Sequence, residues 1–191
     1  SAGFSVLAVD YRGWGDSTAI VPSEDSIVAD AWQAWAELVR RQPLPVRRVI
    51  LGHSMGSAVA VTLASQLHHG QDYGALALES AFNRLPDVAK SAGFLGKVGA
   101  AITTLKFDSA AKIGRVDAPL WMLHGDADAT VPIALGRRLR QAAPAGVHWV
   151  EFAGGSHSRL HDDDPARYLQ AFRDLQATLA PAPGSSKPTT P

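Results

Sequence analysis

A serine between two glycines is the residue of this chain best placed for nucleophilic chemistry. Residues 52–56 read Gly-His-Ser-Met-Gly, at the junction of an apolar run and a helix-like run. The two glycines remove side chains that would clash in a sharp strand-to-helix turn. Such a turn lifts the Ser54 hydroxyl toward substrate, close to the free N–H groups at a helix N-terminus. The pattern predicts Ser54 as a nucleophile and the Met55 N–H as a donor to the oxyanion.

A serine hydroxyl becomes a good nucleophile only when a histidine takes its proton and a carboxylate orients that histidine. The apolar run 119–123 is followed by Asp126 and Asp128. Both acids would lie just past the carboxyl end of a strand, where open α/β sheets place their chemistry. We interpret Asp128 as the acid and Asp126 as a residue that shapes the turn by bonding its own backbone; alternatively, both only form the turn.

The candidate base is His157, which lies in a glycine-rich loop after a strand-like run. A histidine in such a loop can turn its ring toward a neighbouring loop. Seven histidines compete for this role. His53 is expected to pack beside the turn rather than act on Ser54, and His161, four residues beyond His157, is the one serious rival.

Strands and helices that could position these residues alternate along the chain. Short apolar runs predict buried strands of a parallel sheet at 49–51, 119–123 and 147–152. Periodic apolar positions predict helices after Ser54 and over 26–41, 133–142 and 165–179. The acidic run 162–164 is expected to cap the last helix rather than bind a metal. The fold class is therefore α/β.

The order Ser54, Asp128, His157 is that of the α/β-hydrolases, and residues 6–179 resemble this superfamily. Further similar segments are the strand and loop at 6–17, the strand end at 79–82, and the segment 107–119. The last is similar to a branch of small-lid esterases, lysophospholipid or monoacylglycerol lipases and depalmitoylases. The resemblance implies an α/β-hydrolase fold, a mostly parallel sheet with helices on both faces, a small-molecule acyl ester or thioester substrate, and no cofactor.

The chain also departs from the family pattern. Ser57 stands where a second glycine commonly follows the turn. Family members carry three strands and a helix before the strand matched by residues 6–10, and a His-Gly loop there supplies the second oxyanion donor. We therefore expect a fold that lacks its first three strands and belongs to a longer protein. Activity would be impaired, and membrane contact would be possible only through the missing N-terminus.

The expected organisation is one partial domain over residues 1–180. Residues 83–117 would form a small cap over the site, or alternatively an ordinary crossover helix. Trp14 is expected in the wall of the substrate pocket. Residues 181–191 are Pro, Ser, Thr, Gly, Lys and Ala with no apolar cluster, which predicts a disordered tail.

Composition narrows the function further. Eighteen basic and eighteen acidic side chains cancel, which disfavours nucleic-acid binding. With no cysteine there is no disulfide, thiol chemistry or cysteine-zinc site. No stretch approaches the roughly 20 apolar residues of a membrane span, and localisation stays open.

Two alternatives to an esterase remain: a peptidase or haloperoxidase-like member of the superfamily, and a non-catalytic fragment or interaction module.

Overall fold

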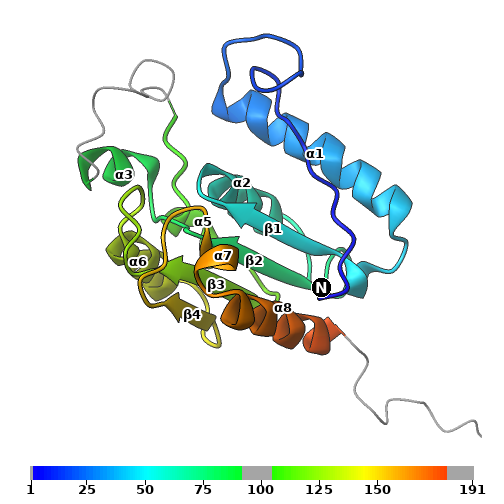
Figure 1. Cartoon of the computed structure of the whole chain (residues 1–191). Coiled ribbons are helices and arrows are strands. Elements are labelled where there is room, and N and C mark those ends of the chain that lie inside the picture. The colour runs from blue at the N-terminus through cyan, green and yellow to red at the C-terminus, as the bar shows by residue number, and fades with distance from the viewer. Residues whose placement is uncertain (1, 92–104, 180–191) are drawn as a thin grey trace, which may run out of the picture.

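A four-stranded parallel sheet forms the centre of the molecule. The computed structural model describes residues 2–91 and 105–179. Its strands are β1 (Val49–His53), β2 (Ala75–Glu79), β3 (Leu120–Gly125) and β4 (His148–Phe152), side by side in that order (Figure 1). All three pairings are parallel, so the carboxyl ends of the strands share one edge. The middle of the expected cap, 92–104, and the expected tail, 181–191, lie outside the described residues.

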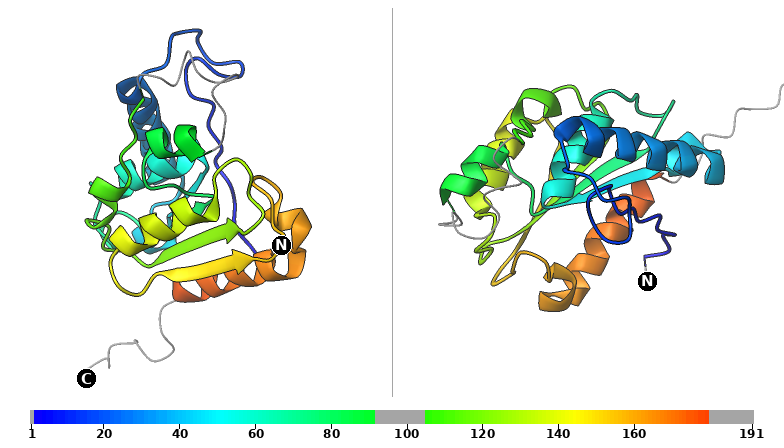
Figure 2. Two further views of the ribbon diagram at one scale, coloured as in Figure 1. Left: turned by 90° about the vertical axis from the view of Figure 1, so that its left-hand side faces the viewer. Right: turned by 90° about the horizontal axis from the view of Figure 1, so that it is seen from above.

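Helices cover both faces of this sheet. They are α1 (Glu24–Arg41), α2 (Met55–Ala64), α3 (Leu85–Ser91), α5 (Ala110–Ile113), α6 (Ile133–Ala142), α7 (Leu160–Asp163) and α8 (Pro165–Leu179), with a 3₁₀ turn at Pro45–Arg47. Figure 2 shows α8 on the face opposite to α2 and α6. The predicted fold class, a parallel sheet with helices on both faces, is confirmed.

Side chains alternate between the two faces of the sheet, as strand geometry requires. On β2, Leu76 and Leu78 are buried in the core that contains α2 and α6 residues. Ala75 and Ala77 are buried in the second core, with Leu175 of α8. Every residue of β2 is buried, which explains why this strand is apolar almost throughout.

Residues 6–10, predicted as a strand by the resemblance, do not form one. Val6 is 80 % exposed, and Leu51 of β1 is 49 % exposed. Among the described residues, β1 pairs only with β2, and residues 6–10 join no ladder. The physical reason is that an extended segment becomes a strand only when a neighbour satisfies its backbone groups.

Helix α1 begins two residues before the predicted start because Ser23 caps it. Ser23 Oγ accepts from the Ser26 N–H at 3.1 Å, and Ser26 Oγ accepts from the Ser23 N–H at 2.9 Å. This reciprocal pair satisfies two backbone donors at the helix start. Trp35 of this helix is buried in the core. Within residues 2–91 and 105–179, the helices are all too short or too polar to cross a membrane.

Candidate active site

Ser54 occupies a strained turn between β1 and α2. Its φ is +52°, in the left-handed region that few non-glycine residues adopt. The turn is held by the Ser54 N–H, which donates to the Glu79 carbonyl at 2.9 Å. Ser57 donates to the Ser54 carbonyl through its N–H at 2.9 Å and its hydroxyl at 2.6 Å. Ser57, the departure from the family pattern, therefore helps to fix the turn.

Only one of the two flanking glycines is required by close packing. A Cβ at Gly52 would lie 2.4 Å from the Gly56 carbonyl oxygen and 2.7 Å from the Ala60 Cβ. Apart from its two chain neighbours and the backbone of its own helix, a Cβ at Gly56 would meet no atom of the described residues within 4 Å. The prediction that Gly56 relieves a clash is thus wrong for this part of the chain. The position is in the first turn of α2, where its Cβ would enter open space.

His157 lies between Ser54 and Asp128. Its Nδ1 is 2.8 Å from Asp128 Oδ2, and its Nε2 is 2.9 Å from Ser54 Oγ. Because a carboxylate can only accept, Nδ1 carries the hydrogen and Nε2 is left to accept from the Ser54 hydroxyl. The rival, His161, instead places its ring 5.9 Å from that of Tyr168.

The Asp128 carboxylate is buried, and both of its oxygens accept hydrogen bonds. Its Oδ1 accepts from the N–H groups of Thr130 at 2.9 Å and Val131 at 2.8 Å. The His124 Nε2 donates to the Val131 carbonyl at 2.8 Å and lies 3.5 Å from Asp128 Oδ2. Burial alone would raise the pKa of Asp128, but hydrogen bonds from His124, His157 and Val131 outweigh it. The pKa of Asp128 is therefore held well below its usual value.

Asp126 does not bond its own backbone, contrary to the prediction. Its Oδ1 accepts from the Gly154 N–H at 2.6 Å, in the loop that carries His157. In the same region the Ala127 N–H donates to the Gly155 carbonyl at 3.1 Å. The glycine-rich loop passes so close to the end of β3 that its backbone donors lie within reach of Asp126. The acid loop and the histidine loop are therefore joined directly.

The acidic run 162–164 has two separate roles in the structure. Asp164 Oδ1 accepts from the Arg167 N–H at 3.0 Å, which caps α8 as predicted. Asp163 Oδ2 instead accepts from both the N–H and the hydroxyl of Ser156, each at 2.7 Å. These hydrogen bonds from Ser156 lower the pKa of Asp163. Across the described residues, no group of three or more His, Cys, Asp or Glu side chains could hold a metal ion.

Two residues that sequence reasoning missed contact the backbone of His157. The His157 carbonyl accepts from His53 Nε2 at 2.8 Å and from Ser80 Oγ at 2.9 Å. Ser80 directly follows β2, so a polar residue just past a strand end was the available signal. His53 directly precedes Ser54, and the expectation that it packs beside the turn agrees with its position.

Met55 and Trp14 complete the predicted site residues. Met55 is the first residue of α2, where an N–H group has no carbonyl one turn earlier in the helix. The Trp14 ring packs edge-on against Tyr11, 6.4 Å between centroids. Within the described residues, no hydrogen bond or ring contact joins Trp14 to Ser54. Its expected place in a pocket wall stays a prediction.

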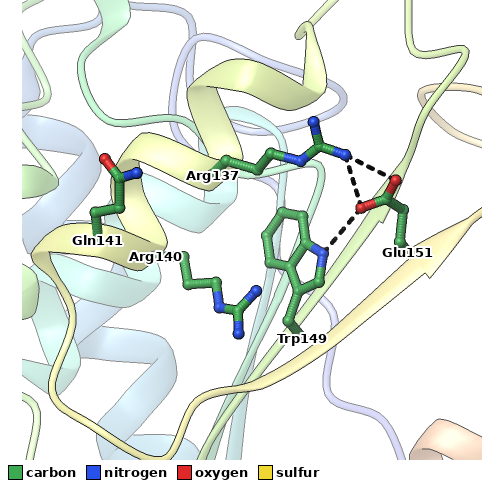
Figure 3. A pocket seen from close by; sticks show the side chains of 5 residues that line it. All are labelled: Arg137, Arg140, Gln141, Trp149 and Glu151. Atoms are coloured by element: carbon green, nitrogen blue, oxygen red, sulfur yellow. Dashed lines mark hydrogen bonds and ion pairs between the residues drawn. The ribbon is translucent and has the colours of Figure 1, made fainter.

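A surface pocket of about 390 Å³ lies elsewhere, between α6 and β4 (Figure 3). It is lined by Arg137, Arg140, Gln141, Trp149 and Glu151. Glu151 accepts from Arg137 Nη2 at 2.8 Å and from Trp149 Nε1 at 3.1 Å. The Arg140 guanidinium lies 5.6 Å from the Trp149 ring centroid. None of the predicted site residues lines this pocket.

Comparisons with known proteins identify relatives of this chain by sequence and neighbours by fold. The chain is 32% identical over 177 residues to the lysophosphatidylserine lipase ABHD12 of Danio rerio, covering 83% of this chain and 45% of the relative. This chain therefore spans less than half the length of that relative. An uncharacterised protein of Mycobacterium tuberculosis is 35% identical over 175 residues, covering 90% of this chain and 59% of that protein.

Among solved structures, an esterase of Pyrococcus furiosus has a TM-score of 0.73 at 17% identity, covering 94% of this chain and 72% of that chain. At this identity the likeness concerns the fold alone. Residues 1–110, more than half of the 191, match the protein family described as serine aminopeptidase, S33. The chain therefore belongs to this family of serine hydrolases, and its fold is that of the α/β-hydrolases.

Proposed function

We propose that Ser54 attacks the carbonyl carbon of a carboxylic ester or thioester, with His157 as base and Asp128 as orienting acid. The observation that carries the proposal is the continuous hydrogen-bonded line from Ser54 Oγ through the His157 ring to Asp128 Oδ2, at 2.9 and 2.8 Å. In this line the serine proton has an acceptor, and the charge that develops on the imidazole has a buried carboxylate beside it.

The reaction would proceed in two acyl transfers. His157 Nε2 takes the Ser54 proton as Oγ bonds to the carbonyl carbon, and the Met55 N–H stabilises the resulting oxyanion. His157 then gives the proton to the leaving alcohol or thiol, which leaves an acyl group on Ser54. Water, deprotonated by His157, attacks this acyl group, and His157 returns the proton to Ser54 Oγ as the acid is released. No step requires a cofactor.

The names of the similar proteins indicate small acyl esters as the substrate class. The zebrafish relative is named a lysophosphatidylserine lipase, and the Pyrococcus neighbour an esterase. We propose a small-molecule ester or thioester for this chain, with residues 83–117 as a small cap and Trp14 in the pocket wall. The balance of 18 basic and 18 acidic side chains does not favour nucleic acid as a partner.

We further propose that the 191-residue chain alone turns over slowly. In the family that this chain resembles, the second oxyanion donor lies in a loop upstream of the segment matched by residues 6–10. Losing one such donor typically costs about 100- to 1,000-fold in turnover. A fluorophosphonate probe, which modifies activated serines, tests this directly. Labelling of this chain should be much slower than labelling of a longer version that includes the upstream strands. Equal rates would overturn the claim of impairment.

Hydrolysis assays test the reaction class. The longer version should hydrolyse p-nitrophenyl esters and acyl thioesters, and Ser54→Ala should abolish both activities. A peptidase is the second candidate, because the matching family is described as serine aminopeptidase. Turnover of peptide substrates that exceeds turnover of esters would favour it. Ester hydrolysis that survives Ser54→Ala would exclude Ser54 as the nucleophile.

A further inference from the structure

The main-chain carbonyl of His157 accepts two side-chain hydrogen bonds from the sheet. His53 Nε2 donates at 2.8 Å and Ser80 Oγ at 2.9 Å. His53 is the last residue of β1, and Ser80 directly follows Glu79, the last residue of β2. Because His53 and Glu79 are paired in register, the two donors reach one oxygen atom from neighbouring strand ends.

These two bonds act at the residue that carries the imidazole. The loop before it is held elsewhere, through the N–H groups of Gly154 and Ser156, which donate to carboxylates of other segments at 2.6 and 2.7 Å. Those bonds fix the loop up to residue 156. The peptide group of His157 itself is tied to the sheet by His53 and Ser80.

Ser80 has a left-handed backbone conformation, which glycine adopts more easily than serine. It is fully buried, and its φ is +50°. A glycine at this position would relieve the strain but would provide no donor to the His157 carbonyl. The hydroxyl therefore gives a physical reason for a serine at a position whose backbone favours glycine.

His53 contributes both a donor and a packing surface. A carbonyl oxygen can only accept, so the His53 Nε2 that faces it carries a hydrogen. The His53 ring centroid lies 5.0 Å from that of His157, with the planes tilted by 51°. His53 thus contacts the proposed base at its carbonyl and at its ring.

We propose that His53 and Ser80 are positioning residues, which hold the His157 carbonyl so that its imidazole stays between Ser54 and Asp128. The expected rates rest on the proposed function, whereas the expected ring position does not. Misplacing a reacting group by about 1 Å can cost about 100-fold in rate. Loss of both bonds should therefore slow the reaction of Ser54 by about 100-fold, and loss of one by about tenfold.

Matched variants separate the hydrogen bond from side-chain volume. His53→Leu removes the donor, whereas His53→Gln retains an amide N–H at similar reach. Ser80→Ala removes the second donor. His161→Leu is the control, since that exposed ring lies against Tyr168 and outside the line of contacts. The rate of fluorophosphonate labelling should fall about tenfold in His53→Leu and about tenfold in Ser80→Ala. In the double variant, which combines these two substitutions, the rate should fall about 100-fold. In His53→Gln and in His161→Leu it should fall less than about threefold.

A second measurement follows the position of the base directly. The proton on His157 Nδ1, which is hydrogen-bonded to Asp128, should give a downfield ¹H resonance in the ¹⁵N-histidine-labelled chain. It should shift or broaden in His53→Leu combined with Ser80→Ala, and should persist in His53→Gln. Thermal unfolding midpoints check that each variant folds.

The outcomes distinguish the two proposals. If the unmodified chain labels at Ser54 and the double variant labels equally fast, the proposed function stands and the positioning role is overturned. If neither the unmodified chain nor the longer version labels at Ser54, the proposed function fails, and the His157 resonance alone decides whether His53 and Ser80 position the ring. A resonance unchanged in the double variant overturns the positioning role, and one lost there but kept in His53→Gln supports it.

Discussion

Asp126 Oδ1 accepts a hydrogen bond from the Gly154 N–H at 2.6 Å, and this bond ties the loop after β3 to the loop after β4. Asp128 lies two residues beyond Asp126, and His157 three residues beyond Gly154. The 2.8 Å contact between Asp128 and His157 therefore depends on two loops that are docked through their backbones as well as through the two side chains.

Replacing Asp126 tests the docking of the two loops. Asp126→Ala removes the acceptor and should lower the free energy of unfolding by about 1 kcal/mol, since the carboxylate is exposed. Asp126→Asn keeps an acceptor oxygen and should cost less. Urea denaturation followed by circular dichroism measures both variants. Equal stability of the two variants would show that the bond to Gly154 contributes nothing.

Replacing Asp128 should damage catalysis far more than any change at Asp126. An amide at position 128 no longer favours the tautomer with hydrogen on His157 Nδ1, so Asp128→Asn should lower kcat for an ester by roughly 10⁴-fold. The measurement is steady-state hydrolysis of a p-nitrophenyl ester by the longer version, with Asp126→Asn as the matched control. A loss below about tenfold in Asp128→Asn would contradict the role of Asp128 as orienting acid.

The lowered pKa of Asp128 predicts a dependence of stability on pH. In the unfolded chain this carboxyl titrates near pH 4, and in the folded chain its pKa lies well below that value. The stabilisation from the ionised form is therefore fully present above about pH 5 and is lost as the pH falls toward the folded pKa. The unfolding free energy of the unmodified chain, minus that of Asp128→Asn, should shrink between pH 7 and pH 3. A difference that is constant, or that grows in acid, would contradict this account.

The two glycines around Ser54 form a matched pair for mutation. Gly52→Ala places a Cβ 2.4 Å from the Gly56 carbonyl oxygen, so it should destabilise the fold by about 2 kcal/mol or more. Gly56→Ala meets open space among the described residues and lies in α2, so it should be neutral or stabilising by up to about 1 kcal/mol. Thermal unfolding compares the two. A Gly52→Ala variant as stable as the unmodified chain would rule out the close approach.

Much of the fold follows from local patterns. The helices α6 and α8 have the predicted bounds, because their apolar periodicity and flanking prolines are local signals. The strand predicted at residues 6–10 failed because pairing depends on a neighbour, which no local pattern reveals. Val6 and Leu7 suit a strand by residue type, yet both are exposed.

The site was predicted only where its residues stand next to recognisable turns. Ser54 is marked by its glycines, and the order of Asp128 and His157 along the chain made these two residues the expected partners. His53 and Ser80 could not be assigned, because their acceptor is a backbone carbonyl that comes 104 and 77 residues later in the chain. The same limit explains Asp126, whose partner Gly154 is 28 residues away.

Mapping the site of fluorophosphonate labelling tests the central claim most directly. The unmodified chain, treated with the probe, digested and sequenced by mass spectrometry, should carry the added mass on Ser54. Ser54→Ala should carry none, and His157→Ala should label far more slowly, whereas His161→Ala should label at the unmodified rate. Label on a different residue, or labelling that is equally fast in Ser54→Ala, would contradict the assignment of Ser54 as an activated nucleophile.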